Sequence, residues 1–247
     1  MAIISWNKKY TETLAVTVER LRHEYPEYKD VKVTYAGRLD PMAEGLLILL
    51  TGEDVHRKEE FLGLPKAYEV DFICGMETDT YDILGRISSV HETTPSKDDC
   101  EKNINSLLGT YQQPYPAYSS KTLNGTALWK HSREGTLDEH DRPTQEITVY
   151  ESTFLRATTI SLDALEQEII TNINKVSGDF RQAEIIQKWK DYFKTIPRED
   201  LVIYTAGFRV SSGTYIRALV SRVGQQLGSG AVSLKIRRTQ VGERTLT

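Results

Sequence analysis

Residues 35–45 read Tyr-Ala-Gly-Arg-Leu-Asp-Pro-Met-Ala-Glu-Gly and place a carboxylate, Asp40, directly before a proline. Proline disfavours helical backbone in the preceding residue, so we expect Asp40 in an extended conformation. The loop between Gly37 and Gly45 leads into the apolar run 45–50, which is typical of a fully buried strand. The pattern therefore predicts a rigid support that presents Asp40 to a cleft, although an Asp-Pro pair alone is also a common turn signal.

Short predicted strands and helices surround this loop. Apolar spacing predicts a helix over residues 13–24, and alternation predicts a strand over residues 66–74. The turn-rich stretch 75–85 that follows implies a sheet meander. Residues 147–160 and 201–212 also have a β-strand pattern, so the chain is expected to be of the α+β class with a mixed sheet.

Three further helices are predicted in the second half of the chain. Ser161 can cap a helix whose apolar stripe extends to Val176, and a second helix follows Asp179 and ends near Pro197. Residues 214–227 form the third helical stretch, which two glycines end. We interpret both stripes as core packing.

Charge is distributed unevenly along the chain. The net charge is −4, yet residues 201–247 hold seven basic residues against one acid, so this segment carries +6 and the remainder −10. Phosphate contacts need lysine and arginine, and a basic segment on an acidic body allows a nucleic-acid partner. A solvated strand and helix face explains the same cluster equally well.

The composition argues against disulfide-bonded, metal-binding and membrane-spanning proteins. The chain has two cysteines outside any C-x-x-C pair and five histidines without metal-ligand spacing, so we expect neither a disulfide nor a metal. No apolar run approaches the roughly 20 residues that a membrane-spanning helix needs, so a cytoplasmic location without membrane contact is expected. Because the distinctive patch is basic rather than apolar, we also expect a monomer.

Five sequence blocks resemble one family in order along the chain. Residues 37–47 resemble the G-x-L-D-P-x-A-x-G-x-L motif around the nucleophilic aspartate of TruB-type pseudouridine synthases. Residues 66–68 match the K-x-Y strand of that family, and residues 75–85 match its G-x-x-T-D-T-x-D-x-x-G motif. Residues 213–217 match G-T-Y-I-R, and residues 228–238 match the closing strand with two arginines.

The resemblance implies a fold and a domain organisation. It implies a pseudouridine synthase fold, with a mixed sheet flanked by helices and an RNA-binding cleft, as one catalytic domain over residues 1–247. A thumb-like insertion is expected at about 112–140, and an extra helical insertion at about 163–200. The small C-terminal PUA domain of bacterial and archaeal relatives is not expected.

The resemblance also implies an activity and three catalytic residues. It implies that a uridine in the T-arm of tRNA, at position 55 of the T-loop, is isomerised to pseudouridine without a cofactor. Asp40 would start the reaction, Arg217 would keep it anionic, and Tyr68 would stack on the uracil. Ile236, where the family usually has leucine, would exclude water.

The target uridine is stacked inside a folded RNA, so the enzyme has to extrude it. Tyr35 occupies the position of a family histidine that braces this extrusion. The other residues expected to contact substrate or RNA are Gly37, Arg38, Leu39, Lys66, Lys121, Arg133, Tyr215, Arg237, Arg238, Lys8 and Arg57.

Two departures from the family and two competing interpretations remain. The N-terminal D-K-P-x-G-x-T motif keeps only Lys8 and Thr13, and a family threonine is replaced by Glu44. One competing interpretation is an RNA-binding folding module that grips the tRNA elbow and whose catalysis is incidental or lost, and a synthase that acts on another RNA is a variant of the synthase interpretation. The other is a glycosidase, which needs a second acid that Glu44 could supply. Asp40, Tyr68 and Arg217 together favour the synthase.

Overall fold

The computed structural model describes residues 2–197 and 199–246, so residues 1, 198 and 247 of the predicted domain lie outside the described residues. In chain order the elements are β1 (Ile3–Lys8), α1 (Leu14–Glu24), η1 (Pro26–Tyr28), β2 (Val33–Ala36), β3 (Ala43–Thr51), η2 (Gly52–Arg57), α2 (Glu59–Leu62), β4 (Lys66–Cys74), β5 (Met76–Thr78), β6 (Ile87–Val90), α3 (Lys97–Asn105), β7 (Gly109–Pro114), β8 (Thr122–Leu123), β9 (Thr126–Ala127), α4 (Leu128–Glu134), η3 (Glu139–Asp141), β10 (Thr144–Ser161), α5 (Leu162–Lys175), α6 (Gln182–Phe193), β11 (Asp200–Val210), α7 (Ile216–Gln226), β12 (Ala231–Val241) and β13 (Arg244–Thr245).

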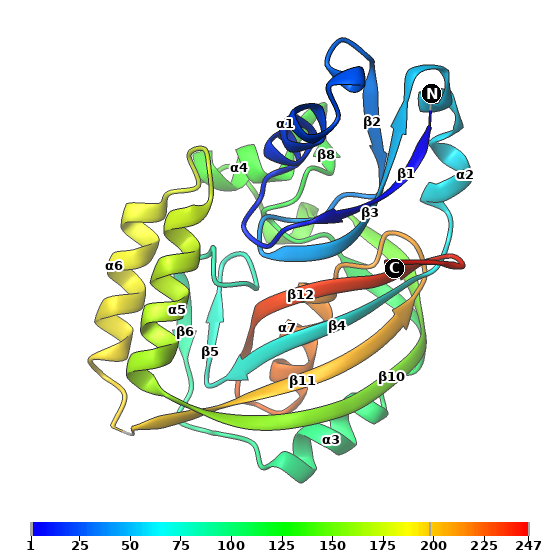
Figure 1. The fold of residues 1–247 in the computed structure, drawn as a ribbon. Helices are drawn as coiled ribbons and strands as arrows, with labels where there is room; N and C mark the ends of the chain where they lie inside the picture. The colour runs from blue at the N-terminus through cyan, green and yellow to red at the C-terminus, as the bar shows by residue number, and fades with distance from the viewer. Residues whose placement is uncertain (1, 198, 247) are drawn as a thin grey trace.

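A mixed sheet of nine strands, counted among the described residues, forms the centre of the molecule (Figure 1). Its strands run in the order β1-β3-β12-β4-β11-β10-β7, with β2 paired to β3 and β13 to β12. β3 and β12 are parallel, whereas β12–β4, β4–β11 and β11–β10 are antiparallel. The predicted α+β class with a mixed sheet is confirmed.

The predicted meander after β4 is wrong. β5 leaves the main sheet and pairs with β6 in a separate two-stranded sheet. β4 instead lies between β11 and β12, which come from the distant end of the chain. Local turn signals mark where a strand ends, but they do not reveal which distant strand fills the neighbouring place.

Helices α3 and α7 cover one face of the sheet, behind β4, β11 and β10 in the view of Figure 1. The largest hydrophobic cluster lies at this interface and includes Phe72 of β4 with Leu219 and Val223 of α7. Burial of this much apolar surface supplies the main driving force for folding. It also fixes the start of α7, which carries Arg217, against the sheet.

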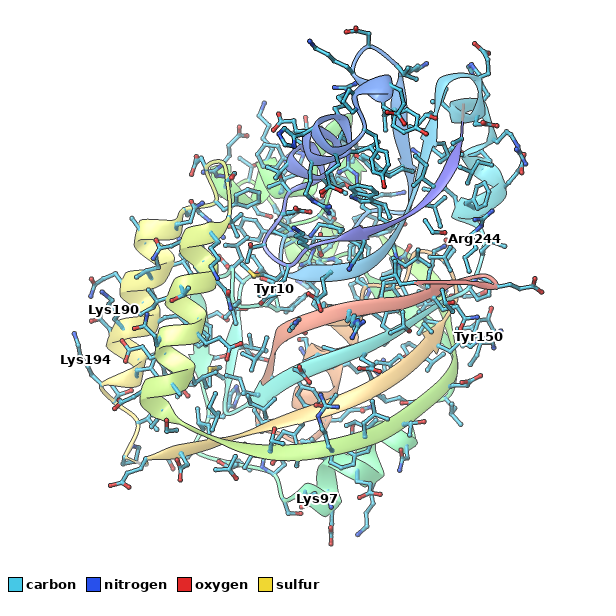
Figure 2. The ribbon with its side chains drawn as sticks, in the orientation of Figure 1. Tyr10, Lys97, Tyr150, Lys190, Lys194 and Arg244 are labelled. Atoms are coloured by element: carbon cyan, nitrogen blue, oxygen red, sulfur yellow. The ribbon has the colours of Figure 1, made fainter. Side chains whose placement is uncertain are left out.

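The predicted helices between residues 161 and 197 are confirmed as an antiparallel pair at one end of the sheet (Figure 1). The Ser161 hydroxyl accepts a hydrogen bond from the Ala164 amide and caps α5, as expected. Trp189 of α6 is fully buried among the apolar side chains of both helices. Lys190 and Lys194 point away from the molecule (Figure 2), so α6 is amphipathic as predicted.

None of the helices within residues 2–197 and 199–246 combines the length and the apolar character that crossing a membrane requires.

Gly45 occupies the closest backbone contact between β3 and β12. It pairs with Arg238 in the parallel register and has a φ angle of +100°. A Cβ atom at this position would lie 2.3 Å from the Arg238 carbonyl oxygen, which is backbone and cannot move aside easily. The last glycine of the sequence motif around Asp40 is therefore required for β12 to dock.

We predict that Gly45→Ala lowers the free energy of unfolding by about 3 kcal/mol, because it adds a clash to a strained left-handed backbone. Gly63→Ala is the matched control, since Gly63 has a φ angle of −73° and open space around its missing Cβ. We expect the control to change stability by less than about 1 kcal/mol. Urea unfolding followed by tryptophan fluorescence measures both, and equal losses would contradict the close-contact explanation.

Candidate active site

The loop between β2 and β3 presents Asp40 from a fixed backbone. The Pro41 carbonyl accepts a hydrogen bond of 2.9 Å from the Thr11 amide. Leu39 and Met42 are both buried and anchor the loop in the core on either side of the carboxylate. The Asp40 side chain is nevertheless 41% exposed, so the loop offers an accessible carboxylate on a rigid support.

Arg217, in the first turn of α7, is the partner of Asp40 and is only 2% exposed. Its Nε donates to Asp40 Oδ2 over 2.9 Å. Its Nη1 donates to the Thr80 carbonyl over 2.6 Å, and its Nη2 donates to the Tyr118 carbonyl over 3.0 Å. All three guanidinium nitrogens are engaged, so one orientation is selected.

The charge of this guanidinium is maintained although it is buried. Burial lowers the pKa of Arg217, but the nearby carboxylates of Asp40 and Asp82 raise it by more, so the net shift is upward. Nearby negative charges favour the charged form of a cation. Arg217 therefore provides a permanent positive charge directly beside Asp40.

The turn over residues 78–85 explains why its motif needs threonines, aspartate and glycine. Asp82 Oδ1 accepts hydrogen bonds from Thr80 Oγ1 at 2.7 Å and from the Leu84 amide at 3.0 Å. Thr78 Oγ1 donates to the Asp82 carbonyl at 2.8 Å. A Cβ at Gly85 would lie 2.3 Å from Thr80 Oγ1, so only glycine fits. The turn thereby fixes the Thr80 carbonyl that Arg217 uses.

Asp82 is a second carboxylate near Arg217, and it is 5% exposed. Burial, with a smaller contribution from the negative charge of Asp40, raises the pKa of Asp82 to about 6 against the lowering effects of Arg217 and of the Thr80 hydroxyl. The two carboxylates therefore differ in environment, because Asp82 is enclosed whereas Asp40 is accessible.

Asp40 and Arg217 line a cavity of about 650 Å³, a size within the usual range for small-ligand sites. The walls come from α1, the Asp40 loop, β4, the turn 78–85, segment 118–133, the α5–α6 connection, the start of α7 and β12. Of the residues predicted as site residues, the lining contains Gly37, Arg38, Leu39, Asp40, Lys66, Tyr68, Arg133, Tyr215, Arg217, Ile236 and Arg238.

The aromatic and apolar wall of the cavity lies around Tyr68. This tyrosine is 8% exposed and projects from β4, while Ile236, 5% exposed, projects from β12. The Tyr215 ring lies 5.5 Å from the Arg217 guanidinium carbon, and burial raises the pKa of Tyr215. The cavity thus joins one charged pair to an apolar, aromatic surface that suits a planar base.

Arg238 is a structural residue here, which contradicts the prediction that it contacts phosphate. It is 1% exposed, and its Nε donates to the Leu46 carbonyl over 2.6 Å. Its Nη1 and Nη2 donate to the carbonyls of Arg38 and Gly37 over 3.3 and 3.2 Å. The guanidinium is therefore hydrogen-bonded to backbone carbonyls, and through them it supports the loop that carries Asp40.

Two predicted RNA-binding lysines are also buried. Lys8 is fully buried and donates to the Ala43 carbonyl over 2.5 Å, which contradicts a phosphate contact in this structure. Burial lowers the pKa of Lys8 to about 8. Lys66 is 4% exposed and donates to the Leu62 and Leu64 carbonyls over 2.7 and 2.6 Å. Burial lowers the pKa of Lys66 to about 8 as well. The two carbonyl contacts make Lys66 a brace of the cavity wall.

Four other predicted contacts lie outside the cavity lining. Tyr35 packs near two cationic side chains, and the Nζ of Lys121 lies 4.9 Å from the centroid of a tyrosine ring. Arg57 is exposed and paired with acidic neighbours. Arg237 is exposed and follows Ile236 on β12, so strand alternation directs it to the opposite face of the sheet.

Glu44 does not supply a second acid to the cavity. It forms an ion pair of 3.0 Å with Lys235 and is not among the lining residues. The glycosidase interpretation relied on Glu44 and loses that support. Within the described residues, no cluster of three or more His, Cys, Asp or Glu side chains is arranged to hold a metal ion.

Three contributors to the site are not evident from the sequence. The pattern predicts Asp82 only as a turn residue, although the T-D-T-x-D spacing with a following glycine marks a tightly bonded carboxylate. Tyr118 was assigned to the thumb-like segment without its carbonyl contact to Arg217. Residues 179–181 of the α5–α6 connection also line the cavity, and no local pattern reveals that contact.

We predict that the free energy of unfolding of Asp82→Asn increases relative to that of the unsubstituted protein as pH rises from 4 to 7. The raised pKa of Asp82 means that the folded state retains a proton that the unfolded state has already lost, so Asp82 stabilises the fold least above pH 6. The asparagine lacks this dependence and gains at most about 3 kcal/mol over that range. Urea unfolding at both pH values measures the difference, and a pH-independent difference would refute the explanation.

Comparisons with known proteins show which family the chain is similar to. The sequence model described as TruB family pseudouridylate synthase (N terminal domain) matches residues 25–178. The tRNA pseudouridine synthase B of Parabacteroides distasonis is 28% identical over 99% of this chain and 87% of the relative. That of Aquifex aeolicus is 29% identical over 94% and 65%, and that of Thermosipho melanesiensis is 30% identical over 85% and 55%. The chain thus spans about half to two thirds of the latter two.

Solved structures share the fold at low sequence identity. A chain of the Cbf5-Nop10-Gar1 complex superposes with a TM-score of 0.55 at 17% identity, over 97% of this chain and 48% of that chain. A chain of an H/ACA RNP bound to a substrate RNA containing 2'-deoxyuridine gives 0.51 at 16% identity, over 97% and 47%. Because the family model covers more than half of the chain, this protein belongs to the TruB family of pseudouridylate synthases.

Proposed function

We propose that this protein converts a uridine in the T-loop of tRNA, at position 55, into pseudouridine. The observation that carries the proposal is the accessible Asp40 carboxylate held by the buried Arg217 guanidinium at a cavity that Tyr68 also lines. The relatives named tRNA pseudouridine synthase B support tRNA as the substrate. A pure binding module has no need of a charged carboxylate beside a desolvated aromatic side chain.

The chemistry follows from the geometry of the pair. The N1–C1′ bond of uridine breaks, the base turns, C5 bonds to C1′, the C5 proton is lost and N1 gains a proton. An ionised Asp40 starts this sequence, by attack on the ribose or by removal of a proton from it. Arg217 aims the carboxylate, since its Nε donates to Asp40 Oδ2 over 2.9 Å and its own position is fixed.

The apolar wall has a separate task during the reaction. Tyr68 stacks on the detached uracil and lies near the C5 proton that has to leave. Ile236 and Leu39 restrict water around C1′ of the ribose, because water bonding there in place of C5 would release the uracil by hydrolysis. The cavity volume accommodates one extruded nucleoside, as base flipping requires.

The access side of the cavity offers partners for the RNA backbone. Arg38 and Arg133 are exposed basic residues in the lining, and exposed Trp129 of α4 offers an aromatic surface beside them. Phosphate contacts position an RNA, while stacking holds unpaired bases. These three residues, together with segment 112–140, are the proposed RNA grip.

We expect Asp40→Asn to abolish pseudouridine formation, with a loss of about 10⁴-fold or more, because the amide keeps the shape but not the charge. The measurement is chemical mapping of pseudouridine in an unmodified tRNA transcript after incubation with purified protein. A transcript with cytidine at position 55 controls for the site of modification, and tRNA binding by the variant controls for its fold. Wild-type protein that binds tRNA without modifying it would favour the folding-module interpretation.

Arg217→Lys is expected to lower kcat by about 100- to 1,000-fold, because an ammonium cannot hold Asp40 and both carbonyls at once. Arg222→Lys is the matched control on the same helix, where the guanidinium packs over the Tyr111 ring at 4.3 Å. Single-turnover kinetics on the transcript should show normal rates for this control. Comparable losses in both variants would mean that helix stability, not Asp40, is affected.

A further inference from the structure

The α5–α6 pair reaches the cavity through the loop that connects the two helices. Phe180 and Arg181 of this connection line the cavity, although the helices themselves pack at the end of the sheet. Trp189 of α6 donates a hydrogen bond of 3.1 Å to the Ile83 carbonyl, in the turn that carries Asp82. The helical pair therefore contacts active-site segments at two separate points.

Within the α5–α6 connection, Arg181 contacts two segments of the active site through its guanidinium. Its Nη1 donates to Asp79 Oδ2 over 2.9 Å and to the Tyr118 hydroxyl over 2.7 Å. Its guanidinium carbon lies 4.3 Å from the centroid of the Tyr118 ring. The side chain is 14% exposed, and its backbone is left-handed with a φ angle of +64°. A strained conformation persists only where surrounding contacts maintain it.

These contacts join the two segments that hold Arg217. Tyr118, which Arg181 binds through its ring and hydroxyl, accepts Arg217 Nη2 at its carbonyl. Asp79, which Arg181 binds through its carboxylate, precedes Thr80, whose carbonyl accepts Arg217 Nη1. Arg181 thus fixes the distance between two acceptors that determine how Arg217 is aimed at Asp40.

A second ion pair joins the same loop to the thumb-like segment. Arg133 Nη2 of α4 lies 2.6 Å from Asp179 Oδ2. The pair is partly exposed, and such pairs contribute little stability by themselves. Its position matters more, since it holds α4 near the connection while Arg181 holds Tyr118.

We propose that Arg181 is a positioning residue that sets the orientation of Arg217 by clamping Tyr118 to the Asp79–Thr80 turn. The inference rests on the proposed function and adds a role for the α5–α6 pair, whose connecting loop carries Arg181. Arg181 acts through Arg217 and has no contact with Asp40. Loss of the clamp lets the two carbonyls move apart, and the Asp40–Arg217 geometry relaxes.

Arg181→Gln tests the proposal with tRNA transcript as substrate. We expect kcat to fall by about 100-fold, because small misplacement of a catalytic group costs that much, while KM stays nearly constant. Arg86→Gln is the matched control, since Arg86 Nε also binds Asp79 Oδ2, over 3.0 Å, and has no hydrogen bond to Tyr118. The control should retain nearly full kcat.

Two further variants isolate the contact with Tyr118. Tyr118→Phe removes the hydroxyl acceptor and keeps the carbonyl, so it should lower kcat less than Arg181→Gln and add little to it in the double variant. Arg181→Lys keeps a cation beside Asp79 without the two-point contact, and should give an intermediate kcat. If Arg181→Gln fails to fold, the kcat values of Tyr118→Phe and Arg181→Lys test the positioning role in its place.

Hydrogen exchange supplies a readout without RNA. The Trp129 amide donates to the Ser119 carbonyl, next to Tyr118, and should exchange faster in Arg181→Gln than in wild type or Arg86→Gln. Wild-type protein without activity would overturn the proposed function, while faster exchange would still support the clamp. Active wild type with unchanged kcat in Arg181→Gln, a change in KM alone, or equal losses in Arg86→Gln would overturn the positioning role.

Discussion

The buried guanidinium of Arg217 is the constraint on which the site depends. Removal of such a charge from water costs several kcal/mol, even after the protein relaxes. Three hydrogen bonds and the nearby Asp40 and Asp82 carboxylates offset this cost. Because the acceptors belong to three separate segments, the cost is offset only when all three are in place. Correct folding of the loop, the turn and segment 118 is thereby coupled to one side chain.

The two members of the pair differ in exposure. Arg217 is enclosed and cannot exchange its partners for water, whereas 41% of the Asp40 side chain remains open to a ligand. In surroundings of low dielectric constant, a fixed cation acts more strongly on its neighbour than it would in water. Asp82 shares the same cation from the closed side, which leaves Asp40 as the accessible anion.

Much of this arrangement could be predicted from the sequence, because it is encoded in local patterns. Strand Lys66–Cys74 and the cap at Ser161 agree with expectation. The contact between Asp40 and Arg217 was expected from the resemblance to the family and not from a local pattern, because 177 residues separate the two. Arg238 illustrates the limit, because a basic residue in a motif looks like a phosphate contact until carbonyl oxygens from β3 and from the Asp40 loop enclose it. The contacts of Arg181 could not be predicted for the same reason, because its partners lie about 60 and 100 residues away in the sequence.

The parallel contact between β3 and β12 has a consequence for how the chain acquires its structure. β3 and β4 follow one another in the sequence, but β12 separates them in the sheet, and the hydrogen bond from Arg238 to Leu46 spans 192 residues. Early in folding these two strands have to leave a vacant place between them, with two unsatisfied edges. Closing such a long loop is entropically costly, and pairing of this kind slows folding. During synthesis, the nascent chain therefore carries an aggregation-prone gap until β12 leaves the ribosome and fills it.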